Sequence, residues 1–171
     1  MRNIIAACLV AVLPLAAAAG IVGQGRDLGP TAAPMPEDLN LMKNGLRVGA
    51  RVVMDSSEDL ALTSAPGDRL RFEAGFLPGA DLPAGTVALD CTLRFVGADG
   101  TLSDPVKQGT CFDGKRDVAK GEWLLLDVTT VFRPTDDDPD GTSGVRIDIT
   151  DTVSGARLTL MPTYGFSGGK Q

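Results

Sequence analysis

The stretch VALDCTLRF, residues Val87 to Phe95, alternates apolar and polar side chains over its whole length. One set of alternate positions carries Val, Leu, Cys, Leu and Phe, and the other carries Ala, Asp, Thr and Arg. Successive side chains of a strand point to opposite faces of a sheet, so this spacing predicts a strand with one buried face. We therefore expect Cys91 to lie in a hydrophobic core.

The same period of two returns along most of the chain, and turn motifs separate the stretches that carry it. RLRFEAGF (69–76) and GVRIDIT (144–150) alternate as clearly, and further strands are predicted at 46–55, 59–64, 122–132 and 156–164. The turn motifs are APGD (65–68), GADG (97–100), FDGK (112–115) and VSGA (153–156). No amphipathic helical window lies between them. This pattern predicts an all-β fold: an antiparallel β-sandwich, immunoglobulin-like or jelly-roll-like, of about seven strands.

The first nineteen residues have the pattern of a secretory signal peptide. Arg2 is followed by an apolar stretch and a run of alanines that offers a cleavage site before Gly20. The apolar stretch is shorter than the roughly 20 residues of a membrane-spanning helix, so we expect no span after cleavage. The predicted organisation is a signal peptide (1–19), a flexible leader rich in Gly, Pro and Ala (20–46), the sandwich domain (47–166) and a disordered tail (167–171). An Ala-rich signal of this length favours the bacterial periplasm or secretion.

The charge balance indicates which partners suit the chain. It has 16 basic and 22 acidic residues, and loss of the signal peptide with Arg2 takes the net charge from −6 to −7. Nucleic acids and anionic membrane surfaces bind clusters of Lys and Arg, which this chain lacks. We expect another envelope or extracellular protein as the partner, and neither nucleic acid nor a membrane surface.

The cysteines predict one disulfide. Of the three in the sequence, Cys8 leaves with the signal peptide, and Cys91 and Cys111 remain. In an oxidising compartment an even pair indicates a bridge, the alternative being two free thiols. A bridge over a loop of about 20 residues stabilises a fold by roughly 3 kcal/mol on the chain-entropy model. The pair differs from an immunoglobulin bridge because its spacing is short and the only tryptophan, Trp123, follows both cysteines.

The residue types exclude most catalytic chemistry. The chain has no histidine, which excludes Ser-His-Asp and Cys-His nucleophile systems and imidazole metal sites. A carboxylate-dependent hydrolase is the remaining enzymatic alternative, but such sites use stacking aromatics and the chain has only eight aromatic residues. We therefore expect no enzymatic activity. Trp123, Tyr164 and Phe166 are the candidates for a ligand or partner surface, and the alternative for each is packing in the core.

The stretch PTDDDPDGTSG, residues 134–144, is the one candidate metal site. Asp136, Asp138 and Asp140, followed by Gly141, fit the first half of a calcium-binding loop. The twelfth position of such a loop requires Glu but is Ile147 here, which the strand pattern sends into the core. Asp148 is the residue that would complete an irregular calcium site. The sequence favours the alternative, a solvated hairpin tip whose charges prevent pairing of strand edges.

These observations lead to two hypotheses of function. The first is an exported, non-enzymatic protein that binds another protein through an exposed strand edge or through the leader, without a cofactor. The second is a small-ligand or carbohydrate-binding module supported by calcium.

Overall fold

The computed structural model describes residues 40–42, 45–57, 59–77, 87–113 and 123–168. This part of the chain contains eleven strands and no helix, which confirms the predicted all-β class. The strands are β1 (Asn40–Leu41), β2 (Arg47–Met54), β3 (Thr63–Ser64), β4 (Leu70–Leu77), β5 (Leu89–Val96), β6 (Lys107–Phe112), β7 (Leu124–Leu125), β8 (Thr130–Phe132), β9 (Gly141–Asp151), β10 (Arg157–Leu160) and β11 (Thr163–Phe166).

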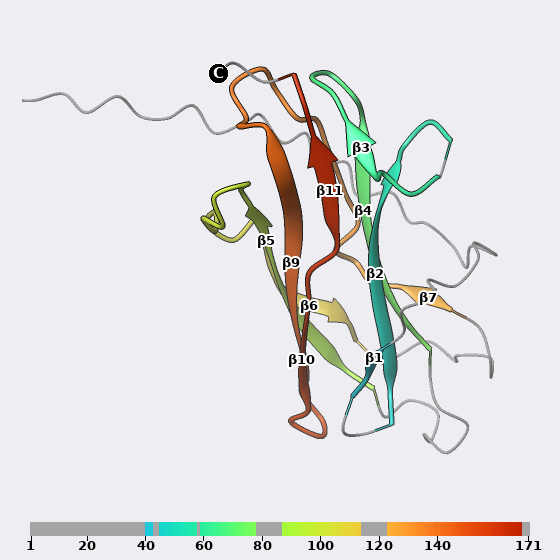
Figure 1. The fold of residues 1–171 in the computed structure, drawn as a ribbon. Helices are drawn as coiled ribbons and strands as arrows, with labels where there is room; N and C mark the ends of the chain where they lie inside the picture. Colours follow the sequence, from blue (N-terminus) through green and yellow to red (C-terminus); the bar gives the residue numbers. More distant parts are fainter. Residues whose placement is uncertain (1–39, 43–44, 58, 78–86, 114–122, 169–171) are drawn as a thin grey trace, which may run out of the picture.

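The strands form two sheets, which Figure 1 shows as separate layers. Sheet 1 has the order β1-β2-β4-β7, and β8 also pairs with β4. Sheet 2 has the order β3-β11-β9-β5-β6, and β10 also pairs with β9. The pairing of β3 with β11 is parallel, and the other strand pairings in the described residues are antiparallel.

The core lies between the two sheets. Ring contacts cross it: Phe76 of sheet 1 meets Phe112 of sheet 2 with ring centroids 4.6 Å apart, and Phe95 meets Phe132 at 4.9 Å. Inward-facing aliphatic residues of both layers surround these rings, among them Val48, Val52, Leu70, Leu89, Leu93, Ile147 and Ile149. The two sheets therefore share one core as a sandwich.

The stretch VALDCTLRF forms β5, which lies between β6 and β9 in sheet 2. Its predicted inner row is buried at Leu89, Cys91 and Leu93, and Phe95 packs against the same core. The predicted disulfide joins Cys91 to Cys111, with a Cα–Cα distance of 5.7 Å. The bridge therefore links neighbouring strands of one sheet rather than facing sheets.

Two predicted strands are interrupted in the structure. Residues 122–132 divide into β7 and β8 around a tight turn in which Val128 N donates to Leu126 O (2.7 Å). Residues 156–164 divide into β10 and β11 at Pro162, which has no amide hydrogen for a sheet ladder. Both halves of the second stretch pair with β9, so that stretch acts as one broken strand.

The sheets also extend beyond the predicted boundary of the domain. Asn40 and Leu41, expected in the leader, form β1 and pair with the start of β2. In the expected tail, Ser167 N donates to Ser64 O (3.1 Å). The predicted signal peptide lies outside the described residues, as do residues 20–39 and 43–44 of the leader and 169–171 of the tail. The described segments contain no helix with the length and apolar character that crossing a membrane requires.

Candidate functional site

The aspartate loop, residues 134–140, connects the two sheets. It leaves β8 in sheet 1 and enters β9 in sheet 2, so the expectation of a hairpin tip is wrong. Residues 122–132 and 144–150 follow each other in the sequence, but their strands belong to different layers, so the turn between them crosses from one sheet to the other.

Carboxylates of this loop accept hydrogen bonds from the backbone. Asp138 Oδ2 accepts from Thr135 N (2.6 Å) and from Thr135 Oγ1 (3.1 Å). Asp140 Oδ1 accepts from Gly168 N (2.8 Å), 28 residues away. Asp136 is exposed. These hydrogen bonds give Asp138 and Asp140 a structural role, shaping the turn and fastening the last described residues.

Asp148 lies far from the other three predicted calcium ligands. It is inside β9, roughly 25 Å along the strand from Asp140 at the usual rise per residue. Its carboxylate is 2.9 Å from the guanidinium of Arg146 and 3.7 Å from that of Arg94, and it accepts a 2.6 Å hydrogen bond from Thr159. The four aspartates therefore do not converge on one ion, and the described segments bring no three Asp, Glu, Cys or His side chains together for a metal.

The surroundings of Asp148 also set its protonation. Burial alone would raise the pKa of this carboxyl group. The hydrogen bonds from Arg146 and Thr159, together with the positive charges of Arg146 and Arg94, outweigh burial and hold the pKa below its ordinary value. Asp148 is thus a charged member of a polar network on the outer face of sheet 2.

The three aromatic residues predicted for a ligand surface are buried, with 9%, 9% and 4% of Trp123, Tyr164 and Phe166 exposed. The ring of Trp123 covers Gly75 in β4, where a Cβ atom would lie 2.5 Å from the indole. Tyr164 packs against Phe132 with ring centroids 5.6 Å apart. Tyr164 and Phe166 belong to the core between the sheets, which was the alternative considered for them. Trp123 lies instead on the other face of sheet 1, because Gly75 alternates with the core residues Ala74 and Phe76 of β4.

Tyr164 is held in its neutral form. Burial and the nearby charge of Asp138 raise the pKa of the Tyr164 hydroxyl to about 12, against a smaller opposing effect of its hydrogen bond with Ser143. The aspartate loop therefore acts electrostatically on the core beneath it.

Sheet 1 carries a row of alternating charges on the face turned away from the core. Glu73 pairs with Arg51 (2.7 Å) and Arg71 (2.7 Å), and Asp55 pairs with Arg71 (3.1 Å) and Arg69 (2.6 Å). The side chain of Glu73 is only 6% exposed. Each carboxylate of the row has basic partners, as buried charges require, so we assign the row a structural role.

The edge of sheet 2 at β6 exposes backbone groups to solvent. Val106 N donates to Leu93 O (2.8 Å), so Leu93 turns its backbone groups toward β6. Backbone direction alternates along paired antiparallel strands, so Gly109 faces β5 while Gln108 and Thr110 turn their amide and carbonyl groups to the open side. All three residues are exposed, and no described strand other than β5 pairs with β6.

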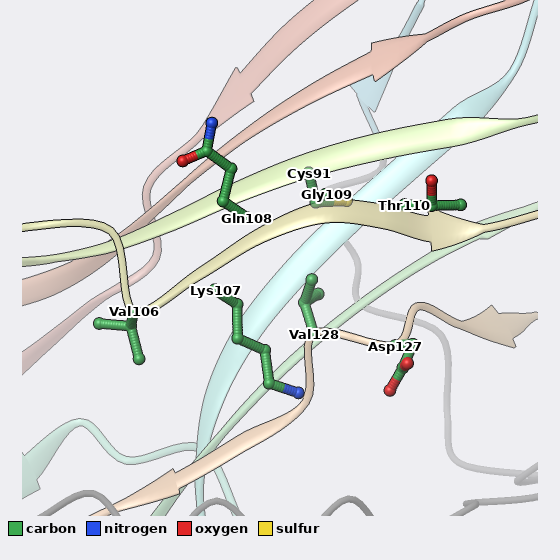
Figure 2. A pocket seen from close by; sticks show the side chains of 8 residues that line it. All are labelled: Cys91, Val106, Lys107, Gln108, Gly109, Thr110, Asp127 and Val128. Carbon is green, nitrogen blue, oxygen red and sulfur yellow. The ribbon is translucent and has the colours of Figure 1, made fainter.

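A pocket of about 400 Å³ lies beside this edge (Figure 2). It opens between β6 and the segment that leads to β8, and its lining residues are Cys91, Val106, Lys107, Gln108, Gly109, Thr110, Asp127 and Val128. Two contacts join β6 to that segment: Lys107 Nζ donates to Thr129 O (3.3 Å), and Asp127 N donates to Cys111 O (3.0 Å). The middle of the edge stays open between these contacts.

The disulfide fixes this edge to the rest of the sheet. Leu89 pairs with Phe112 and Asp90 with Thr110, which leaves Cys111 as the extra residue of a β-bulge. The bridge from Cys111 to Cys91 joins β6 to β5 at this irregular point.

Sequence reasoning missed β6 because KQGTCF has no alternation of apolar and polar residues. Lys107, Gln108 and Thr110 are polar, and Gly109 has no side chain. The available signal was the disulfide itself, since a partner of Cys91 must lie beside the strand that carries Cys91.

Comparisons with known proteins give the chain no family. No protein-family model matches it, and no curated protein is similar to it in sequence. Among solved structures it is similar to a family 123 glycoside hydrolase from Clostridium perfringens, studied for glycolipid glycan hydrolysis, with a TM-score of 0.38 and 12% identity. The match covers 70% of this chain and 27% of that enzyme. A similarity at this level does not bear on function.

Proposed function

We propose that this protein is an exported, non-enzymatic assembly module of the bacterial periplasm or cell surface, which receives an extended segment of a protein partner at β6. The observation that carries the proposal is the open edge at Gln108, Gly109 and Thr110 beside a pocket. An added strand gains affinity from main-chain hydrogen bonds and specificity from pockets for alternate side chains. The outward backbone groups of Gln108 and Thr110 offer the main-chain hydrogen bonds, and the pocket offers a place for a side chain of the partner.

Export is supported by the cysteine chemistry. Disulfides persist in oxidising compartments such as the bacterial periplasm, and the chain carries one between Cys91 and Cys111. The pattern of residues 1–19 agrees with that location. The lack of histidine supports a binding role over a catalytic one.

Many proteins protect edge strands with lysine residues and bulges, and β6 has both. Their positions leave the centre of the strand accessible. Lys107 lies at one end with its ammonium group held by Thr129 O, and the bulge at Cys111 lies near the other end. Protection is thus confined to the two ends of β6.

Proline at residue 108 tests the proposal directly. Gln108→Pro removes an outward amide hydrogen that β5 does not use, so the sheet keeps its own ladder while the edge loses a donor. Gln108→Ala keeps that donor and is the matched control. We expect capture of a partner from envelope extract with the wild type and the Ala variant, and its loss with the Pro variant. Equal capture by all three proteins would overturn binding at this edge.

A further inference from the structure

Sheet 2 has a second open edge at β10, on the far side of β9 from β5. Val145 N donates to Pro162 O (3.0 Å), so β9 turns the backbone groups of its odd-numbered residues toward this side. Leu158 and Leu160, which pair with Ile149 and Ile147, therefore face β9. The backbone groups of their neighbours Arg157 and Thr159 point outward, and both residues are exposed. No described strand pairs with β10 on its outer side.

We propose that the extended segment received at β6 is β10 of a second copy of this chain. This inference rests on the proposed function and names its partner. The strand directions agree: β6, β5, β9 and β10 form successive antiparallel pairs, so β6 and β10 run in opposite directions. Two copies in the same orientation then meet in an antiparallel ladder and continue the sheet from one molecule to the next.

Charge favours this junction over a pairing of β6 with β6. Asp90, Asp104 and Asp127 lie in or beside the part of sheet 2 that ends at β6 and outnumber the single basic residue of β6, Lys107, while β10 contributes Arg157. Joining two β6 edges would bring two acidic surfaces together, whereas joining β6 to β10 brings a guanidinium to an acidic edge.

Shape also favours this junction. The pocket opens beside β6 where Gly109 has no side chain, and nothing lies within 4 Å of the place where a Cβ atom would stand. Leu158 in β10 is half-buried and points to the core side of sheet 2. In a continued sheet, the part of this side chain that is not packed against its own core faces the side on which the pocket opens, and Val106 and Val128 supply the apolar part of the pocket lining there.

The inferred contact is head-to-tail, because the two edges differ. Each copy offers one β6 and one β10, so copies add in a row unless the twist of the sheet closes them into a ring. Blocking either edge in every copy therefore stops association entirely.

The test measures molar mass by light scattering over a concentration series, using the exported protein purified from the envelope fraction. We expect the molar mass of the wild type to increase with concentration. Gln108→Pro and Thr159→Pro should each remain monomeric. An equimolar mixture of the two variants forms a dimer and nothing larger, because each retains one intact edge. Thr159→Ala, which loses the same hydroxyl bond to Asp148 but keeps the outward amide, associates like the wild type, as does Gln108→Ala.

Circular dichroism checks that each variant is folded. If Gln108→Pro does not fold, Thr110→Pro replaces it, and if Thr159→Pro does not fold, Arg157→Pro replaces it. A wild type that stays monomeric at every concentration overturns the inference. So does a Thr159→Pro variant that still dimerises, which would indicate a β6–β6 contact. If Thr159→Pro binds an envelope protein that Gln108→Pro does not, the proposed function stands with another partner. If Gln108→Pro binds it as well, the proposed function fails.

Discussion

At the scale of single residues, Tyr164 makes the stability of the fold sensitive to alkaline pH. Its pKa is raised to about 12 from an ordinary value of 10, so the folded state holds the phenolic proton more tightly than the unfolded chain. Below pH 10 both states are protonated and the stabilising contribution is complete. Between pH 10 and about 12 the unfolded chain loses its proton first, so stability falls.

This prediction is measured by urea unfolding across that pH interval, with Tyr164→Phe as the control. We expect the wild type to lose stability more steeply than the variant, which has no phenol to ionise. Tyr164 is the sole tyrosine, so the ultraviolet absorbance of tyrosinate follows this one group. An ordinary titration near pH 10 in the folded protein, or equal slopes for both proteins, would contradict it.

Asp138 and Asp140 show what residue patterns can and cannot predict. Their spacing fits half of a calcium loop, yet their carboxylate oxygens accept hydrogen bonds from the amides of Thr135 and Gly168. The partner of Asp140 is 28 residues away, and no local pattern contains that information. The position of Asp148 on the outer face of its strand was predictable, because Ile147 and Ile149 beside it define the inner face.

At the scale of elements, removal of the disulfide should weaken the attachment of β6 to β5. In Cys91→Ala/Cys111→Ala the pairing of β6 with β5 loses its covalent link at the bulge. We expect a loss of roughly 3 kcal/mol in the free energy of unfolding, as the chain-entropy model gives for a loop of this size. Urea unfolding measures the loss, and hydrogen exchange should show faster exchange in β6 than in β9.

The wild type treated with reductant after unfolding provides the control, since it loses the bridge without losing the cysteine side chains. Equal stability with and without the bridge would contradict the prediction. Unchanged exchange in β6 would mean that the contacts of Lys107 and Asp127 are enough to hold this edge.

Strands with a buried face were predictable, and the strand at the candidate site was not. β4, β5 and β9 carry alternating apolar residues that face the core. The bounds of β4 and β5 were predicted to within two residues, whereas β9 begins at Gly141, three residues before the predicted stretch and inside the predicted loop. β6 lies at an edge, where Gln108, Gly109 and Thr110 need no apolar side chains. An edge strand that stays accessible for binding lacks the signal by which strands are recognised.

At the scale of the whole molecule, we expect the melting temperature to be the same in calcium and in chelator. The aspartates that fit a calcium loop lie at one end of β9, and Asp148, the proposed fourth ligand, lies well along the strand. A ligand that binds the folded state stabilises it in proportion to its affinity, so the absence of a shared site predicts no shift. Thermal melting monitored by circular dichroism measures this.

Magnesium at the same ionic strength is the control, because it screens the acidic surface equally. A rise in melting temperature with calcium alone would support the calcium-supported ligand module instead. Substitution of Asp136 by Asn would then show whether the aspartate loop provides the site.

The parallel pairing of β3 with β11 has a consequence for the order of folding. It joins Thr63 and Ser64 to Gly165 and Phe166, so residues about a hundred positions apart must meet. β5 and β6 form a local hairpin, and their disulfide needs only the segment between Cys91 and Cys111. Local contacts form quickly and distant ones slowly, so the β5–β6 hairpin and its covalent bridge should form before β11 joins β3. Until β11 joins, β3 and the adjoining edge of β9 lack their partner strand, and sheet 2 stays open on that side.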